Sequence, residues 1–443
     1  MDALAEAVIA GAAPSDLERT AVPRQYIAAH LRKDGVNLFH GVTDKDVRES
    51  LRVGPVRMPE LAPDEVLIAT MASSMNHQTV SSALFEPQPT FGHLEQLGRQ
   101  GGFERRHDQD FHVIGSDAAG VVVRVGSGVR RWAVGDHVVV AGAWVDSQEP
   151  GTHGDGMLGG EQRAWGVETN YGGLAHYSIA RADQVLPKPG HLTWEEAASV
   201  TLCATTAYRM LVSENGARIK QGDIVLIWGA TGGLGAFAVQ LVRNAGGIAV
   251  GVVSSEEKAR RLAALGCDLV VNRSELALDE PGVSTADLGR RLGRVIRGEL
   301  GEDPHVVFDS SGSATFGISV FVVRPGGVVV TSGSPSGPWH EFDNRYLWMN
   351  LKRVIGCHVA NYQEAWDCNR LFTLGRLSPV LSRTFPLAEI GEAARLMQTN
   401  RHVGKIGVLC LAPREGLGVT DPALRERLGQ RRLTPLRAPV PAV

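Results

Sequence analysis

Cysteine is scarce in this 443-residue sequence, and neither sign of charge is in large excess. No Cys-x-x-Cys pair occurs, and the cysteines are odd in number and far apart: Cys203, Cys267, Cys357, Cys368 and Cys410. This spacing predicts neither a disulfide framework nor a thiolate zinc site, so we interpret each cysteine as a small buried residue. The formal net charge of −3 gives no electrostatic reason to expect nucleic acid or an anionic membrane as a partner.

Long apolar runs are missing as well. No stretch of about 18 apolar residues occurs, and the first residues contain no basic segment that leads into an apolar run. We therefore expect a cytoplasmic protein without a membrane-spanning helix. The length and the 43% hydrophobic content suit two packed domains, and the 52 glycines predict many tight turns.

The first half of the chain is expected to form an N-terminal extension followed by a bent β domain. Residues 1–45 mix helical patterning with polar stretches, and short β-rich runs broken by glycines fill much of 46–205. Two polar or glycine-rich segments, near 85–111 and 145–165, interrupt the rhythm of these strands. We interpret them as insertions that form oligomer contacts or a lid.

The second half alternates apolar strands with helical stretches. This pattern over residues 206–360 predicts a parallel, doubly wound sheet of the Rossmann type. Residues 361–420 are expected to return to the first domain. The last segment, 421–443, is rich in Arg and Pro and is interpreted as a surface tail.

A glycine-rich loop follows one of these apolar strands and precedes a helix that is expected to begin near Gly235. In that context glycines allow a sharp turn and a close approach to a pyrophosphate, while the helix start offers unpaired N–H donors. We therefore predict a dinucleotide site made by seven consecutive residues: Gly229, Ala230, Thr231, Gly232, Gly233, Leu234 and Gly235.

Two serines, Ser254 and Ser255, stand at the tip of the following strand, where a carboxylate would pair with the ribose hydroxyls of NAD. Lys258 and either Arg260 or Arg261 follow about one helical turn later. Hydroxyl and cationic groups at this place favour the 2′-phosphate of NADP. We expect NADPH as the cofactor, held here by Ser254, Ser255, Lys258 and Arg260.

The same segment has a second interpretation. Ser254 and Glu257 have the spacing of a helix capping box, which would leave Glu256 free to contact the ribose. The two interpretations are compatible with each other, and the preference for NADPH over NADH rests on the serines and the cations together.

No metal site is expected. Zinc-dependent alcohol dehydrogenases need Cys, His and carboxylate ligands, but residues 112–120 read His-Val-Ile-Gly-Ser-Asp-Ala-Ala-Gly, and no Cys-rich lobe occurs. His112 alone is interpreted as structural. Without a Lewis acid, alcohol oxidation is disfavoured, whereas hydride addition to a C=C bond that a thioester carbonyl activates remains reasonable.

The sequence resembles the crotonyl-CoA carboxylase/reductases, a branch of the medium-chain dehydrogenase/reductases, from about residue 25 to residue 420. Four strings carry the resemblance: Trp194-Glu195-Glu196-Ala197-Ala198, Trp228-Gly229-Ala230-Thr231-Gly232-Gly233-Leu234-Gly235, Asp343-Asn344-Arg345-Tyr346-Leu347-Trp348-Met349 and Gly404-Lys405-Ile406-Gly407-Val408-Leu409-Cys410-Leu411-Ala412-Pro413. It implies an α/β protein in which a Rossmann domain interrupts a GroES-like β domain, without zinc. It also implies that NADPH reduces a 2-enoyl-CoA at the β-carbon and that the resulting enolate attacks CO2 to form an alkylmalonyl-CoA. A proton is added instead where CO2 is absent.

The resemblance further implies a CO2 pocket, which is only partly matched. The Glu and the His of the family pattern correspond to Glu168 and His358. The family's Asn is replaced by Gln78, its Phe by Val167, and a further aromatic residue by Val359. Either carboxylation has weakened, or the two valines enlarge the acyl pocket while Gln78 re-forms the CO2 contact. We slightly favour retained carboxylation because Glu168 and His358 are present.

Arg345 and Tyr346 fall where the family contacts the CoA phosphates or the adenine, and Arg suits bidentate phosphate binding. The alternative is that both residues cap a packed helix. We expect a homo-oligomer, either a dimer or a tetramer. A quinone or enone reductase without a CoA ligand and a catalytically silent nucleotide-binding protein remain as other functions, and the carrier could be CoA or an acyl carrier protein.

Overall fold

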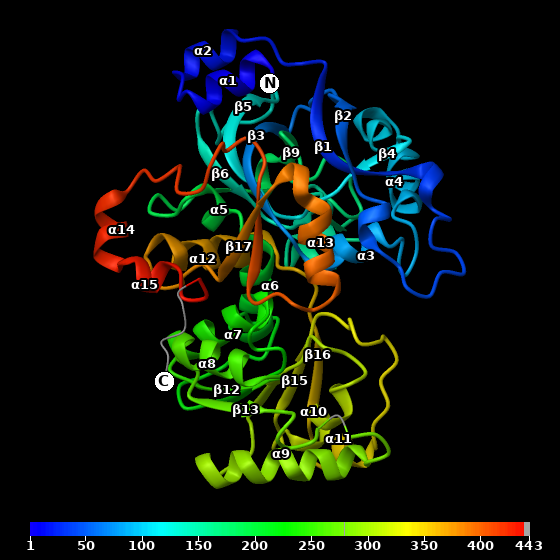
Figure 1. Ribbon diagram of the computed structural model, residues 1–443, viewed down its shortest axis with the longest axis vertical. Helices are drawn as coiled ribbons and strands as arrows, with labels where there is room; N and C mark the ends of the chain where they lie inside the picture. The colour runs from blue at the N-terminus through cyan, green and yellow to red at the C-terminus, as the bar shows by residue number, and fades with distance from the viewer. Residues whose placement is uncertain (279, 438–443) are drawn as a thin grey trace. The chain divides into compact units, whose positions relative to one another are not determined.

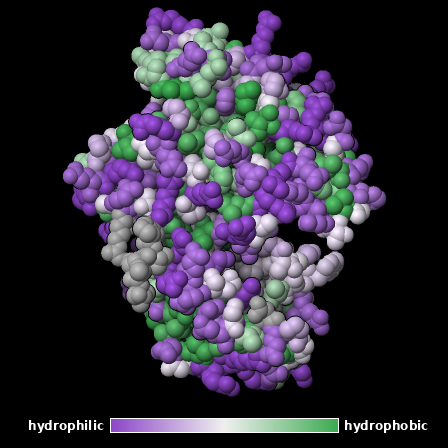
Figure 2. All heavy atoms as spheres, viewed as in Figure 1, coloured by the Kyte–Doolittle hydropathy of each residue, from purple (hydrophilic) through white to green (hydrophobic). Residues whose placement is uncertain are grey.

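The computed structural model describes residues 1–278 and 280–437, and the chain divides into two compact units (Figure 1). Unit 1 comprises Met1–Leu202, Asn361–Gly375 and Leu381–Leu433. Unit 2 comprises Cys203–Ala360, Arg376–Val380 and the segment from Thr434 onward. No helix among the described residues is long and apolar enough to cross a membrane. Hydrophilic and hydrophobic residues are interspersed on the face that Figure 2 shows.

The main sheet of unit 1 has seven strands. Its order is β10-β6-β5-β3-β18-β17, and β9 also pairs with β3. All pairs are antiparallel except β17 with β18. The strands are β3 (Glu65–Ser74), β5 (Ala119–Val125), β6 (His137–Val140), β9 (Tyr177–Arg181), β10 (Val185–Pro187), β17 (Leu381–Pro386) and β18 (Lys405–Leu409). Every residue of β3 is buried, which fits its central place and its apolar composition.

A smaller sheet has the order β2-β1-β4, with β1 (Gln25–Arg32) between β2 (Arg52–Arg57) and β4 (Phe111–Val113). The segment that the sequence suggested as an extension, 1–45, thus supplies the central strand of this sheet. It also contains α1 (Ala3–Ile9) and α2 (Pro14–Arg19). A two-stranded ribbon pairs β7 (Ala143–Trp144) with β8 (Arg163–Ala164).

The helices of unit 1 are short. Two of them position the site described below: α3 (His77–Ala83) and α4 (Phe91–Gly98), the second lying in the 85–111 insertion. Their apolar faces share a buried cluster with β1 and β18. The others are α5 (Trp194–Ala197), α12 (Tyr362–Thr373), α13 (Ile390–Gln398), α14 (Pro422–Leu428) and α15 (Gln430–Leu433), while α6 (Thr201–Leu211) continues into the residues of unit 2. The segment interpreted as a tail therefore carries α14 and α15.

Unit 2 is built on a six-stranded parallel sheet in the order β13-β12-β11-β14-β15-β16. The strands are β11 (Ile224–Ile227), β12 (Ile248–Val253), β13 (Leu269–Asn272), β14 (Val306–Phe308), β15 (Val328–Thr331) and β16 (Arg353–Gly356). The helices are α7 (Gly233–Asn244), α8 (Glu256–Leu265), α9 (Thr285–Leu300), α10 (Phe316–Val322) and α11 (Arg345–Trp348). The strand order reverses between β11 and β14, as in a doubly wound nucleotide-binding sheet. The predicted fold class is confirmed.

Candidate active site

The predicted phosphate loop connects β11 to α7 in unit 2. Gly229 has φ +60°, a left-handed backbone conformation that favours glycine. The helix begins at Gly233, two residues earlier than expected, and Gly232 is its N-cap. A Cβ on Gly235 would overlap the carbonyl oxygen of Gly229, so only glycine allows the helix to pack this closely on the loop.

This loop lies at the carboxyl end of β11, beside the place where the strand order reverses. In open α/β sheets, ligands bind outside the carboxyl ends of the strands at this switch point. The first turn of α7 offers backbone N–H donors and the positive end of the helix dipole there. The chemistry of the loop therefore fits the pyrophosphate of a dinucleotide.

A buried network of hydrogen bonds includes Trp228, the residue directly before the loop. The indole Nε1–H of Trp228 donates to Ser319 Oγ at 2.9 Å, and Ser319 Oγ donates to Asp309 Oδ2 at 2.7 Å. Asp309 is fully buried at the end of β14 and also accepts from Thr315 Oγ1 at 2.9 Å. These bonds tie the ends of β11 and β14 to α10.

The tip of β12 provides hydroxyl groups at the start of α8. Ser255 is the N-cap of this helix, and its side chain accepts from the backbone N–H of Lys258 at 3.3 Å. The alternative with a capping box from Ser254 to Glu257 is therefore wrong, because the helix starts one residue later and Lys258 occupies the third position. The carboxylate of Glu257 instead lies 3.0 Å from Arg261 Nη2.

A second cation lies near the tip of β12, and it was not predicted from the sequence. Arg273 directly follows β13, and its backbone N–H donates to Val253 O at 2.9 Å, at the end of β12. Burial and then the positive charge of Arg273 lower the pKa of Lys258, so the two cations lie near each other. Arg260 instead lies 3.9 Å from Glu256, and residues two apart on a helix do not share a face. No signal in the sequence pointed to Arg273, because the pairing of β13 with β12 is a property of the folded sheet.

Three residues predicted for the CO2 pocket gather in unit 1. Gln78 lies in the first turn of α3, and its Nε2 donates to Ser116 Oγ at 2.8 Å. The backbone N–H of Gly115, the residue before Ser116, donates to the carbonyl oxygen of Gly166 at 3.2 Å. A Cβ on Gly166 would overlap the carbonyl oxygen of Gly115. The loop that carries Val167 and Glu168 therefore packs directly against the segment that Gln78 contacts.

The carboxylate of Glu168 has two different neighbours. Oε2 accepts from the backbone N–H of Ala164 at 2.7 Å. Oε1 lies 3.7 Å from Nδ1 of His93, a residue of α4 that sequence reasoning did not single out. Val167, beside Glu168, is half-buried. The carboxylate is thus oriented by the backbone on one side and faces an imidazole on the other.

His112 is structural, as the sequence indicated. Burial lowers its pKa to about 3, so the ring is neutral near pH 7. Its Nε2 lies 3.1 Å from the carbonyl of Thr169, which can only accept, so Nε2 carries the proton. Its Nδ1 therefore accepts from the hydroxyl of Thr90, 2.8 Å away. The ring joins the start of α4 to the residue after Glu168.

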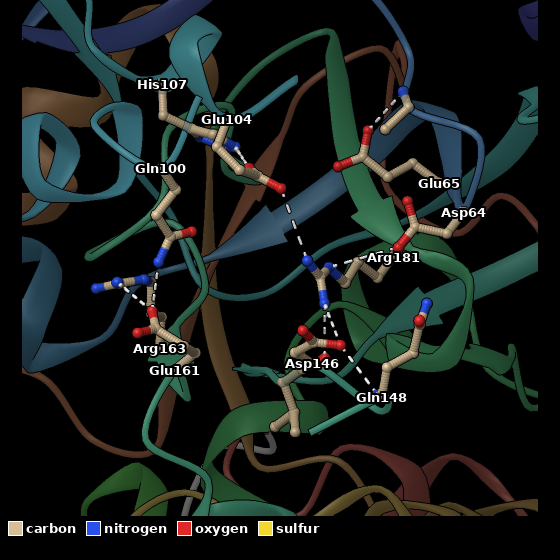
Figure 3. A network of polar contacts seen from close by, with 12 residues as sticks. Asp64, Glu65, Gln100, Glu104, His107, Asp146, Gln148, Glu161, Arg163 and Arg181 are labelled. Carbon is tan, nitrogen blue, oxygen red and sulfur yellow. Dashed lines mark hydrogen bonds and ion pairs between the residues drawn. The ribbon is translucent and has the colours of Figure 1, made fainter. Parts of the chain in front are cut away.

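The two insertions are tied together within unit 1, as Figure 3 shows. Arg181 lies 3.7 Å from a carboxylate oxygen of Glu104 in the first insertion and 3.9 Å from one of Asp146 in the second. Its guanidinium also stands over the ring of Trp144, 3.6 Å from the centroid. Gln100 Nε2 donates to Glu161 Oε2 at 2.5 Å. These contacts hold the two insertions together.

The remaining predicted residues lie in unit 2. His358 follows β16, and the next residue, Val359, has φ +48°. The guanidinium of Arg345 is exposed and pairs with Asp343, Nη2 to Oδ2 at 2.6 Å. The ring of Tyr346 packs edge-on against Phe321, with centroids 4.7 Å apart. Arg345 is therefore accessible to a phosphate that competes with Asp343, whereas Tyr346 is partly used in packing.

Known proteins match both units. The family "Alcohol dehydrogenase GroES-like domain" matches residues 62–190, and "Zinc-binding dehydrogenase" matches residues 233–372. The crotonyl-CoA reductase of Streptomyces collinus is 48% identical over 94% of each chain, and the crotonyl-CoA carboxylase/reductase of Cereibacter sphaeroides is 37% identical over 89% of this chain and 90% of the other.

A solved structure of the 2-octenoyl-CoA carboxylase reductase CinF, in complex with NADP and 2-octenoyl-CoA, has 59% identity to this chain. Its TM-score is 0.96, and the match covers 98% of this chain and 99% of that one. The solved crotonyl-CoA carboxylase/reductase AntE in complex with NADP has 34% identity and a TM-score of 0.77, covering 89% and 96%.

The fold and the two matched domains define a medium-chain dehydrogenase/reductase. Within that class, the chain belongs to the crotonyl-CoA carboxylase/reductase family. The resemblance that the sequence motifs indicated is confirmed.

Proposed function

We propose that this protein reduces a 2-enoyl-CoA with NADPH and couples the reduction to carboxylation, giving an alkylmalonyl-CoA. The observation that carries this proposal is the 59% identity, over 98% of the chain, to a reductive carboxylase solved with NADP and 2-octenoyl-CoA. The phosphate loop at the switch point supports it, as does the placement of Gln78, Val167 and Glu168 on neighbouring segments of unit 1.

The cofactor preference follows from the tip of β12. Bound NADPH supplies the hydride, and its 2′-phosphate carries the negative charge that distinguishes it from NADH. Lys258 and Arg273 provide two neighbouring cations, and Ser254 and Ser255 provide hydroxyl donors beside them. Charge-assisted hydrogen bonds to a phosphate are stronger than neutral ones. We therefore assign the 2′-phosphate site to these four residues, with Arg273 in place of Arg260.

The carbon-fixing step is proposed to involve Gln78, Glu168 and His358. Hydride addition at the β-carbon moves the C=C electron pair to the α-carbon, and this enolate carbon forms the new bond to CO2. Ser116 fixes the amide of Gln78, so the longer side chain has a defined position rather than a free one. This anchoring favours retained carboxylation. Val167, smaller than the Phe of the family pattern, leaves room for an acyl chain longer than that of crotonyl-CoA.

Arg345 and Tyr346 are proposed to contact the CoA portion, and Arg345 would then pair with a CoA phosphate instead of with Asp343.

A homo-oligomer is proposed to form through the edge of the sheet in unit 2. In the described sheet β16 is one of the two edge strands, and three large apolar side chains before it are exposed: Trp348, Met349 and Leu351. Exposed edge strands with apolar neighbours readily pair with a second chain.

The test supplies NADPH with crotonyl-CoA or 2-octenoyl-CoA, with and without bicarbonate, and identifies the products by mass. We expect the carboxylated product with bicarbonate and faster turnover of the longer thioester. Saturated acyl-CoA alone at saturating bicarbonate would contradict the carboxylation proposal. No turnover of either thioester would contradict the enoyl-CoA reductase assignment itself.

A further inference from the structure

His93 lies against the carboxylate of Glu168, and the mechanism outlined above gives it no role. It stands in the first turn of α4, within the 85–111 insertion. Its Nδ1 is 3.7 Å from Oε1 of Glu168, the oxygen that the backbone N–H of Ala164 does not hold. Both side chains are about a quarter exposed, 28% for His93 and 25% for Glu168. The contact is therefore partly shielded from water.

The neighbour on the other side of the ring decides which nitrogen carries the proton. Nε2 of His93 lies 3.2 Å from the side-chain amide nitrogen of Gln88. An amide nitrogen donates and does not accept, so Nε2 of the neutral ring is the acceptor. The proton is then on Nδ1, which faces Glu168. With its amide placed in this way, Gln88 favours the tautomer that presents an N–H to the carboxylate.

The position of His93 is set by the buried core of the insertion. Thr90, at the start of α4, donates to His112, and His112 donates to the carbonyl of Thr169, the residue after Glu168. His112 and Thr90 are buried. The helix that carries His93 and the loop that carries Glu168 are therefore joined by a rigid link, so their separation does not depend on surface side chains.

We propose that His93 is a positioning residue of the carboxylation site: its imidazole, with Nδ1 3.7 Å from Oε1 of Glu168, restricts the rotation of this carboxylate, and the orientation of the carboxylate sets how much of the enolate reacts with CO2. This inference rests on the function proposed above. The competing reaction is transfer of a proton from water to the enolate α-carbon, which leaves hydroxide. Displacements of about 1 Å at a reacting centre change rates strongly, so a carboxylate free to rotate lowers the share of the C–C bond-forming reaction.

The test compares His93→Asn with His93→Leu, using 2-octenoyl-CoA, NADPH and varied bicarbonate. The Asn side chain places its amide nitrogen close to the position of Nδ1 and keeps the donor, whereas Leu has similar bulk and no donor. We expect His93→Leu to raise the KM for bicarbonate about threefold and to lower the carboxylated fraction, because the imidazole that faces Oε1 of Glu168 at 3.7 Å is removed. NADPH oxidation should stay within about threefold of wild type, and His93→Asn should restore most of the carboxylated fraction.

His153→Leu, at an exposed histidine of the other insertion, is the matched control and should change nothing. Gln88→Leu, which removes the group that favours this tautomer, should lower the carboxylated fraction by a smaller factor, and it tests the same contact without altering His93. Unchanged product ratios in His93→Leu and Gln88→Leu would overturn the inference, as would an equal loss in His93→Asn and His93→Leu. If wild type forms no carboxylated product at all, the proposed function fails and this inference fails with it.

Discussion

Replacing Lys405 by methionine should destabilise unit 1 far more than removing an exposed ion pair of similar length. Lys405 and Asp117 are both buried, with side chains 2% and 0% exposed, and Nζ lies 3.0 Å from Oδ2. The ammonium also donates to Met75 O at 2.7 Å and to Asn76 Oδ1. All three of its protons are therefore used inside the protein.

The carboxylate of Asp117 likewise has its hydrogen-bond partners inside the protein. It accepts from Ser74 Oγ at 2.7 Å, Asn76 Nδ2 at 2.8 Å, Thr201 Oγ1 at 2.6 Å and the backbone N–H of Leu202 at 2.9 Å. Lys405→Met leaves this anion buried without its counter-charge, which typically costs roughly 3–5 kcal/mol. For a unit of this size, that loss lowers the melting temperature by about 10 °C.

Differential scanning calorimetry measures this shift. The matched control is Lys33→Met, because Lys33 Nζ lies 2.8 Å from Glu95 Oε1 but 42% of its side chain is exposed. An exposed pair of this kind contributes about 0–1 kcal/mol, so the control should melt within about 3 °C of wild type. The reasoning would be refuted if both variants showed the same small shift. The carboxylated fraction of the Lys405 variant should also fall, since Asn76 leads directly into α3 and Gln78.

Three further outcomes are expected. Arg273→Ala should raise the KM for NADPH about 10- to 100-fold with little change for NADH, and an equal rise for both would contradict a 2′-phosphate role. Gly235→Ala should abolish NADPH binding, measured by quenching of protein fluorescence, because its Cβ overlaps the Gly229 carbonyl; wild-type affinity would disprove this packing argument. Burial lowers the pKa of Lys188 from 10.5 to about 7, so the unfolded chain binds an extra proton between these values. The free energy of unfolding should therefore rise from pH 7 to pH 10 in urea titrations and should rise less in Lys188→Met.

Local chemistry was enough to predict the strand-loop-helix unit that is proposed to bind the nucleotide. The glycines from Gly229 to Gly235 and the serines at Ser254 and Ser255 act through the conformation and donors of a single strand-loop-helix unit. The alternation of apolar strands with helices likewise predicted the parallel sheet, because each strand buried on both faces must be apolar along its whole length. Even here the helix start was misplaced by two residues, since Gly232 caps the helix without a side-chain signal.

Only the tertiary structure decided which distant residues meet. Arg273 is close enough to lower the pKa of Lys258 because β13 neighbours β12 in the sheet, and spacing along the chain does not encode that order. His93 faces Glu168 because the insertion that carries α4 is hydrogen-bonded, through His112, to Thr169, the residue after Glu168. The sequence by itself determined the class of cofactor, through motifs whose effect is local, and it indicated the chemistry through its resemblance to a known family. The partners of Lys258 and Glu168 were settled by packing, because such contacts depend on how whole elements cover one another.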